Sequence, residues 1–137
     1  HSQLLARHQA RLPENKSGNR VVFHDPCYLG RYRNIYDAPR EVIARSAEVI
    51  EPHRARQRSF CCGAGGGLAF LGEEKGKRVS VERAEELTAT GAEVVGAACP
   101  FCNTMFRDAL AAISPSPPKL LDIAQIAAAS IRQGSQD

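Results

Sequence analysis

The stretch Arg20-Val21-Val22-Phe23-His24-Asp25-Pro26-Cys27 sets the fold, because it joins a short apolar run to a stop signal and a thiol. Residues 20–24 are predicted to form a buried strand that Asp25-Pro26 ends. Cys27 then lies at the carboxyl end of this strand. The pattern recurs downstream, where a second apolar strand is predicted over 93–98 and Cys99 follows directly. Two thiols are therefore expected just beyond the ends of two strands.

Helical and strand patterns alternate along the rest of the chain. Helices are predicted over 2–12, 38–50, 76–90, 101–112 and 123–131, and further strands within 51–60 and at 119–121. This alternation predicts an α/β fold, a small Rossmann-like three-layer domain with a mostly parallel sheet. In such sheets ligands bind in the crevice outside the carboxyl ends of the strands. Cys27 and Cys99 both belong to that edge.

Length and composition are those of one soluble globular domain, with 137 residues, 43% of them hydrophobic and 24% charged. We expect an N-terminal helix and linker at 1–19, the cysteine-rich domain at 20–132 and a disordered tail at 133–137. No apolar run approaches the roughly 20 residues of a membrane span, and no signal-peptide pattern is visible. The chain begins at His1 and its only methionine is Met105, so we expect a fragment of a longer protein.

The net charge of +3 is mild, but it includes two basic clusters, at 53–58 and 75–78. Such clusters could attract phosphate or an acidic partner protein. Neither is interleaved with aromatic residues, so stacking on single-stranded nucleic acid is unsupported and no nucleic-acid partner is expected. A solvated surface is the favoured interpretation of both clusters.

All five cysteines fall into one spaced constellation: Cys27, the adjacent pair Cys61-Cys62, then Cys99 and Cys102. The odd number and the adjacent pair argue against a secreted disulfide framework and favour a reducing cytoplasm. Thiolates are soft ligands that favour zinc, cuprous copper and iron–sulfur clusters. The simplest interpretation is a metal centre.

The segment Cys99-Pro100-Phe101-Cys102 lies between a predicted strand and a predicted helix. The positive end of the helix dipole is expected to lower the pKa of both thiols. Two interpretations fit this segment taken alone, half of a metal site or a thioredoxin-like redox pair.

The pair Cys61-Cys62 and the glycines after it favour the metal site. Adjacent cysteines are poor disulfide partners, but they can offer two sulfurs to neighbouring metal atoms; the alternative is that one is a small buried apolar residue. The loop 63–67 lacks the Lys-Ser/Thr of a phosphate loop and the dinucleotide-binding spacing. It is either a flexible turn or a cradle whose backbone amides donate to sulfur. We prefer the cradle, with Gly63, Gly65 and Gly66 as cofactor-binding residues.

Several polar and aromatic residues lie near the predicted site. His24 is expected to hold a supporting or structural place rather than to be a ligand, and His53 to be exposed. The segment after Cys27 is crowded with tyrosines and arginines, which could shield the site, contact a substrate or simply pack the loop: Tyr28, Arg31, Tyr32, Arg33 and Tyr36.

Three motifs together resemble the cysteine-rich CCG domain of heterodisulfide reductase catalytic subunits and their bacterial relatives. They are His24-Asp25-Pro26-Cys27-Tyr28-Leu29-Gly30-Arg31-Tyr32, Cys61-Cys62-Gly63-Ala64-Gly65-Gly66-Gly67 and Ala98-Cys99-Pro100-Phe101-Cys102. The resemblance covers about residues 1–125. The stretch 28–40 is most similar to electron-transfer-flavoprotein:quinone oxidoreductases and to membrane-linked heterodisulfide reductases.

The resemblance implies a specific cofactor and role. Five thiolates would ligate a noncubane [4Fe–4S] cluster in an electron-transfer domain of a larger oxidoreductase: Cys27, Cys61, Cys62, Cys99 and Cys102. Zinc or an empty site is expected after aerobic handling. Family members commonly carry two CCG motifs and a ferredoxin-like segment, whereas this chain has one motif and no ferredoxin cysteines.

The expected partners are the missing domains of the parent polypeptide and a redox protein or flavoprotein donor. The isolated domain is then not expected to be a complete enzyme. We expect a cytoplasmic location without membrane contact by this segment, any membrane association being carried by the rest of the parent protein. Two alternatives remain, a structural zinc domain and a metal-free thiol–disulfide module that uses Cys99 and Cys102.

Overall fold

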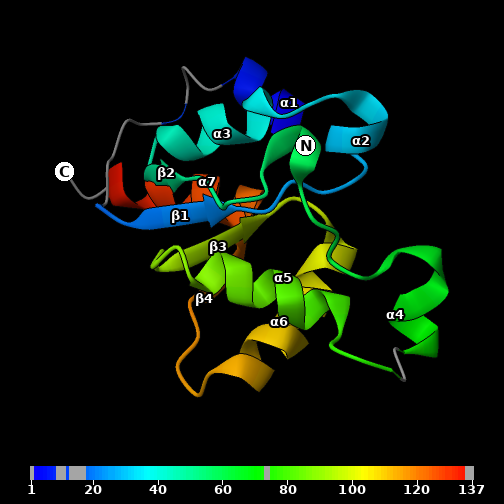
Figure 1. Cartoon of the computed structure of the whole chain (residues 1–137). Coiled ribbons are helices and arrows are strands. Elements are labelled where there is room, and N and C mark those ends of the chain that lie inside the picture. The colour runs from blue at the N-terminus through cyan, green and yellow to red at the C-terminus, as the bar shows by residue number, and fades with distance from the viewer. Residues whose placement is uncertain (1, 9–11, 13–17, 73–74, 135–137) are drawn as a thin grey trace.

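A parallel sheet forms the centre of the molecule (Figure 1). The computed structural model describes residues 2–8, 12, 18–72 and 75–134. In this part of the chain four strands pair in the order β2-β1-β3-β4, and every pair is parallel. The strands are β1 (Arg20–Phe23), β2 (Glu48–Ile50), β3 (Val94–Ala97) and β4 (Lys119–Asp122). The predicted α/β class with a parallel sheet is confirmed.

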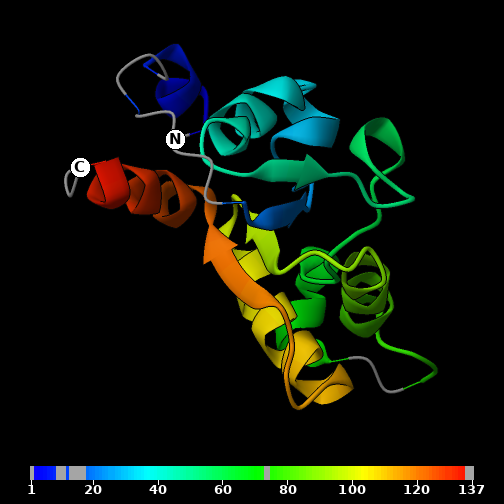
Figure 2. The ribbon, with the colours of Figure 1, turned by 90° about the vertical axis from the view of Figure 1, so that its left-hand side faces the viewer.

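Helices cover both faces of this sheet (Figures 1 and 2). Those of the described residues are α1 (Ser2–Arg7), α2 (Gly30–Arg33), α3 (Asp37–Ala44), α4 (Leu68–Leu71), α5 (Val79–Thr88), α6 (Pro100–Ile113) and α7 (Ile123–Gly134). Helices α3 and α7 pack on one face, with α1 against them, and α5 and α6 pack on the other. Among the described helices, none combines the length and apolar character that crossing a membrane requires.

The strand β1 explains why both faces are covered, because its successive side chains alternate between two cores. Val21 and Phe23 pack in the core under α3 and α7, whereas Val22 packs with residues of α5 and α6. In β3, Gly96 lets α7 approach the sheet closely: a Cβ there would lie 3.2 Å from Val21 Cγ1 and 3.3 Å from Ile126 Cδ1. The result is a three-layer sandwich.

The predicted helix over 38–50 is wrong in its second half. Helix α3 ends at Ala44, and Glu48–Ile50 form β2, which pairs with Arg20–Val22 of β1. The spacing of Val42, Ile43, Ala47 and Ile50 suits a helix, but pairing with a central strand decides the outcome, because tertiary contacts override local periodicity. The strand expected within 51–60 therefore lies just before that range, which instead contains a 3₁₀ turn, η2 (Arg56–Arg58).

Other boundaries move by a few residues. The helix predicted over 76–90 is α5, which starts at Val79 because Gly76 has a positive φ of 75° and Arg78 is extended. Gly91 follows it at φ 71°, in the left-handed conformation that commonly ends helices. Helices α2 and α4 were not predicted. Residues 9–11, much of the predicted linker and the predicted tail from 135 on lie outside the described residues.

The topology brings the first and third strands side by side. From β1 the chain passes through α3 to β2 at one edge, and then through α5 to β3 on the other side of β1. The strand order thus reverses direction between β1 and β3, which is where open α/β sheets bind ligands. Cys27 follows β1 and Cys99 follows β3.

Candidate metal centre

All five cysteines line one cavity of about 220 Å³ at this edge of the sheet. Cys27 comes from the turn after β1, Cys99 from the N-cap of α6 and Cys102 from the first turn of that helix. The pair Cys61-Cys62 enters from the loop before the glycines. The other lining residues are Tyr28, Ala64, Gly65, Gly67, Phe70 and Phe101. The structure thus brings together every thiol that the spacing singled out.

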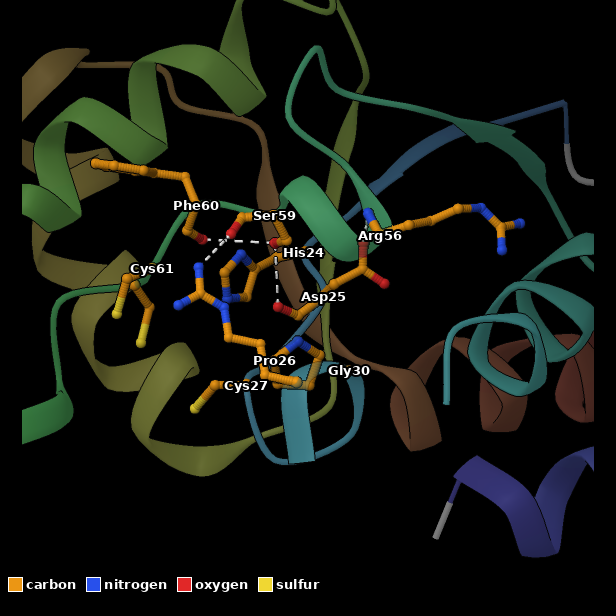
Figure 3. Close-up of a pocket in the computed structure, with 11 residues that line it drawn as sticks. His24, Asp25, Pro26, Cys27, Gly30, Arg56, Ser59, Phe60 and Cys61 are labelled. Carbon is orange, nitrogen blue, oxygen red and sulfur yellow. Dashed lines mark hydrogen bonds between the residues drawn. The ribbon is translucent and has the colours of Figure 1, made fainter. Parts of the chain in front are cut away.

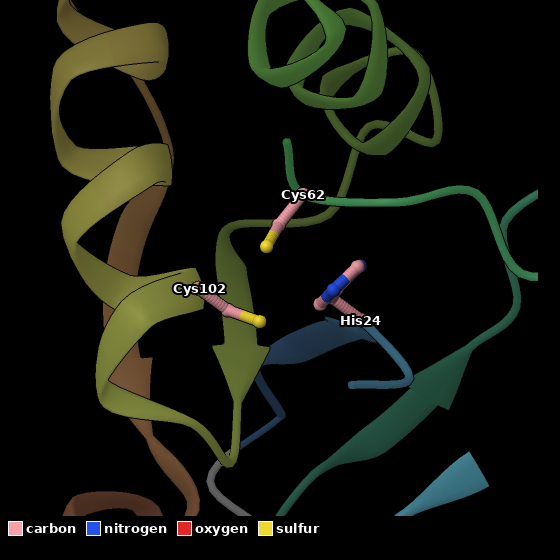
Figure 4. Close-up of side chains that lie close together, drawn as sticks. All are labelled: His24, Cys62 and Cys102. Atoms are coloured by element: carbon pink, nitrogen blue, oxygen red, sulfur yellow. The ribbon is translucent and has the colours of Figure 1, made fainter. Parts of the chain in front are cut away.

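The thiols differ in burial. Cys62 and Cys102 are buried, Cys61 and Cys99 are half-buried and Cys27 is exposed; all five are free thiols. Figure 4 shows the two buried sulfurs beside the imidazole of His24. A ligand atom of each of these three residues lies within 4.8 Å of the other two. The cavity therefore runs from a closely packed inner group to an open mouth.

Hydrogen bonds to sulfur decide which of the thiols in the cavity are charged. Hydrogen bonds from Cys102, His24 and the Ala64 amide lower the pKa of Cys62 to about 4. The pKa of Cys99 falls to about 6, because Cys102 and the amides of Cys102 and Phe101 donate to its sulfur. Two thiolates at neutral pH follow from these shifts, and the thiolate is the form that binds metal.

Cys102 departs from the prediction that the helix dipole lowers both pKa values of the C-x-x-C. Its pKa is raised, because its thiol donates to the sulfurs of Cys62 and Cys99 and it is buried. Burial and the neighbouring thiols also raise the pKa of Cys27. At Cys102 the hydrogen bonds between thiols and the burial outweigh any effect of the helix dipole.

The glycine loop turns backbone amides toward the sulfurs. The Gly63 amide donates to Cys61 Sγ at 3.3 Å, and the Ala64 amide donates to the Cys62 sulfur. Of the predicted cofactor-binding glycines, Gly65 lines the cavity, whereas Gly66 does not belong to its lining. Gly67, which was not singled out, lines it as well. This geometry favours the cradle over a flexible turn.

Replacing Gly63 by alanine is expected to destabilise the domain by about 1–3 kcal/mol. Gly63 has a φ of 87°, and a Cβ would lie 3.2 Å from the Ser80 amide nitrogen and 3.3 Å from Val79 Cβ. Gly65→Ala is the matched control, since its φ is not positive and a Cβ there meets no atom within 4 Å. Urea unfolding of the reduced proteins measures the difference; equal stability of the two variants would contradict it.

Asp25 fixes the backbone just before Cys27. Its carboxylate accepts from Arg40 Nη1 at 2.7 Å and Nη2 at 2.9 Å, and from the Arg56 amide at 2.8 Å. The Ser59 hydroxyl donates to the Asp25 carbonyl, and Arg31 donates to the Ser59 carbonyl at 2.9 Å. Figure 3 shows Asp25 and Ser59 between Arg56 on one side and Cys27 and Cys61 on the other. These bonds tie the turn after β1 to the segment that carries the adjacent cysteines.

The tyrosines near Cys27 divide into two roles. Tyr36 is buried against Gly30, where a Cβ would lie 2.7 Å from its ring. Tyr28 and Tyr32 are 72% and 74% exposed and lie 5.5 Å apart, and Tyr28 lines the cavity. Packing therefore explains Tyr36 alone.

The basic clusters make ion pairs with neighbouring acidic side chains. Arg54 pairs with Glu82 and Glu86, and Lys77 with Glu82 and Glu85. Arg56 pairs with Asp37. His53 is exposed, as predicted. The arginines that matter most to the site, Arg40 and Arg83, gave no signal in the sequence, because each lies in a charged helix that resembles a solvated surface.

The segment of this chain that matches known proteins includes the whole candidate site. A model of the family described as the CCG cysteine-rich domain matches residues 21–107, which include all five cysteines. The chain is 38% identical over 122 residues to the probable iron-sulfur-binding oxidoreductase FadF of Bacillus subtilis, and 37% over 123 residues to the EtfAB:quinone oxidoreductase of Syntrophomonas wolfei. These matches cover 87% and 83% of this chain.

A third relative is archaeal. The chain is 35% identical over 103 residues to one subunit of the dihydromethanophenazine:CoB–CoM heterodisulfide reductase of Methanosarcina mazei, and 73% of it is covered. The chain spans 17% of the length of the two bacterial relatives and 25% of the archaeal one. The motifs, the matched range and the identities agree: the chain belongs to the CCG cysteine-rich domain family.

Proposed function

We propose that this domain holds an iron–sulfur cluster on its five cysteines and transfers electrons as part of a larger oxidoreductase. The cluster proposed is a noncubane [4Fe–4S] cluster with Cys27, Cys61, Cys62, Cys99 and Cys102 as ligands. The observation that carries the proposal is that all five thiols line one cavity at the topological switch point. The relative named as a probable iron-sulfur-binding oxidoreductase supports it.

The residues present fit such a cluster. Cys62 and Cys99 have pKa values of about 4 and 6, so both are thiolates at neutral pH. Amides of Gly63 and Ala64 donate to the sulfurs of Cys61 and Cys62. Hydrogen bonds of this kind tune the reduction potential of iron–sulfur centres. When bound, the cluster would supply single-electron redox chemistry, and the chain would supply ligands, amide donors and a mostly apolar cavity.

The mouth of the cavity supports docking of a redox partner. Tyr28, Phe70 and Phe101 line the cavity and are 72%, 85% and 56% exposed, and Leu71 beside them is 78% exposed. Exposed apolar groups collected around a site mark interaction surfaces. We infer that other domains of the parent polypeptide or a redox protein donor cover them, and that the isolated domain turns over no substrate. A cytoplasmic location, with membrane association through other domains, fits this role.

Anaerobic reconstitution tests the proposal. The reduced protein, incubated with iron and sulfide, is expected to bind about four irons and four sulfides if the cluster is of the [4Fe–4S] type. Iron and sulfide analysis gives the stoichiometry, and EPR of the reduced and oxidised protein gives the cluster type. After aerobic purification, zinc or no metal is expected. Failure of the fully reduced protein to bind iron would overturn the proposal.

A structural zinc site is the second candidate, because His24, Cys62 and Cys102 place ligand atoms within 4.8 Å of one another. Zinc takes four tetrahedral ligands, so one further thiol would complete the site. This candidate leaves two of the five cysteines without a role. Tight zinc binding after both aerobic and anaerobic purification, with no uptake of iron, would favour it.

A further inference from the structure

A fully buried arginine stands behind the metal centre. Arg83 of α5 is 0% exposed, and its Nη1 donates to Glu86 and to the Arg54 carbonyl, both at 2.9 Å. Within the described residues, its Nη2 has no hydrogen-bond partner. An unsatisfied buried donor lowers the stability of a fold. Burial of Arg83 is therefore unfavourable for stability.

The third nitrogen of the guanidinium, Nε, contacts the site. Arg83 Nε lies 3.3 Å from His24 Nδ1, and both side chains are buried. An arginine nitrogen can only donate, so Nδ1 must accept. An imidazole that accepts at Nδ1 is neutral and carries its proton on Nε2. Arg83 therefore selects one tautomer of His24.

The other side of the His24 ring faces sulfur. His24 hydrogen-bonds the Cys62 side chain, and one of its ring nitrogens lies within 4.8 Å of the sulfurs of Cys62 and Cys102 (Figure 4). Phe106 holds the ring from the edge, with centroids 4.7 Å apart and an angle of 81°. The ring therefore has one orientation, in which Nδ1 is occupied by Arg83 and Nε2 is left for sulfur.

We propose that Arg83 is a positioning residue for the metal centre: it fixes His24 in the tautomer whose Nε2–H donates a hydrogen bond to the Cys62 sulfur. His24 is then a donor to a ligand and not itself a ligand, since a metal needs the lone pair of an unprotonated nitrogen. Donation to a thiolate sulfur stabilises the more negative, reduced state of a cluster. This redox consequence rests on the proposed function, whereas the tautomer does not.

The tautomer is tested on the reduced, metal-free protein by ¹⁵N NMR of its histidines. His24 is expected to show a protonated Nε2 and an unprotonated Nδ1. In Arg83→Met the His24 Nδ1 loses its donor, so the preference for the Nε2-protonated tautomer is expected to weaken, whereas Glu86→Gln keeps the Arg83 Nε donor and is the control. A proton on Nδ1 of His24 in the unchanged protein would overturn the proposal, and this result needs neither a metal nor a folded variant.

The redox consequence is tested on the iron-loaded protein. His24→Phe keeps an aromatic ring against Phe106 but removes the donor, and His24→Gln offers an amide N–H in its place. Loss of one hydrogen bond to a charged sulfur is expected to change the ratio of reduced to oxidised cluster at fixed potential about tenfold, or about 59 mV downward for one electron. Partial recovery in His24→Gln is expected. An unchanged midpoint potential in His24→Phe with full iron content would overturn the redox role.

Failure of this inference and failure of the proposed function give different results. If the domain binds no iron, the potential cannot be measured, but the ¹⁵N spectrum still shows whether Arg83 selects the tautomer. If the domain binds iron and His24→Phe loses it, His24 is a ligand and the inference is wrong while the metal centre stands.

Discussion

Changing Cys27 to serine is expected to weaken iron binding more than about 100-fold, because changes in the groups that only surround metal ligands already cost 10- to 100-fold. Cys27 is the most exposed of the five thiols and the only one that comes from the turn after β1. The cavity would keep four thiols, enough for a tetrahedral zinc site but one short of the proposed set. Iron and sulfide content after anaerobic reconstitution, with EPR, measures the loss.

The same variant separates the three candidate functions. A zinc domain keeps its metal, because His24, Cys62 and Cys102 remain and Cys61 or Cys99 can supply the fourth ligand. A metal-free thiol–disulfide module keeps its redox activity, because Cys99 has a pKa of about 6 and Cys102 lies beside it. Only the iron–sulfur proposal predicts loss of the centre.

Asn103→Ser is a suitable control for the cysteine variant, since its side chain lies next in sequence to Cys102 but contacts Asp122 at 3.5 Å. It should bind iron as the unchanged protein does. Retention of full iron content in Cys27→Ser would contradict the five-thiol assignment. It would indicate that the inner group around Cys62 holds the metal without Cys27.

The residues of the site were predicted more completely from the sequence than the secondary-structure elements that carry them. The spacing of the cysteines and two apolar runs were enough to place Cys27 and Cys99 at the carboxyl ends of two strands of one parallel sheet, because parallel strands share their carboxyl edge. The glycines after Cys62 predicted amide donors to sulfur. The chemistry of cysteine and glycine follows from the residue type itself, so a single sequence is enough to predict these features of the site.

What the sequence did not predict depends on pairing between distant segments. Glu48–Ile50 continue a helical pattern and become β2 only because β1 offers an unpaired edge. Arg83 likewise stands between two glutamates of a charged helix, and only the packing of α5 against the sheet turns it toward His24. Asp25 before Pro26 indicates the end of a strand, but its sequence context gives no sign that it also binds Arg40.

Replacing Asp25 by alanine is expected to destabilise the domain by about 3 kcal/mol, because removal of one partner from a buried ion pair leaves the other uncompensated. The side chains of Asp25 and Arg40 are 2% and 8% exposed. Although burial opposes it, hydrogen bonds to Glu51 and Asp25 raise the pKa of Arg40. Arg40 stays charged in the variant as well, because a guanidinium is not deprotonated in proteins. Glu51 still pairs with it, which places the cost at the lower end of the range for buried pairs.

An exposed pair beside it provides the control. Asp37 and Arg56 form an ion pair with side chains 74% and 42% exposed, so Asp37→Ala is expected to cost less than about 1 kcal/mol. Urea unfolding of the reduced, metal-free proteins compares the two variants. Asp25→Ala should also loosen the turn that carries Cys27, because the Arg56 amide and Arg40 hold that turn through the same carboxylate. Equal stability of the two variants would mean that other contacts hold Cys27 in place, and that the Asp25 carboxylate is not what fixes the turn after β1.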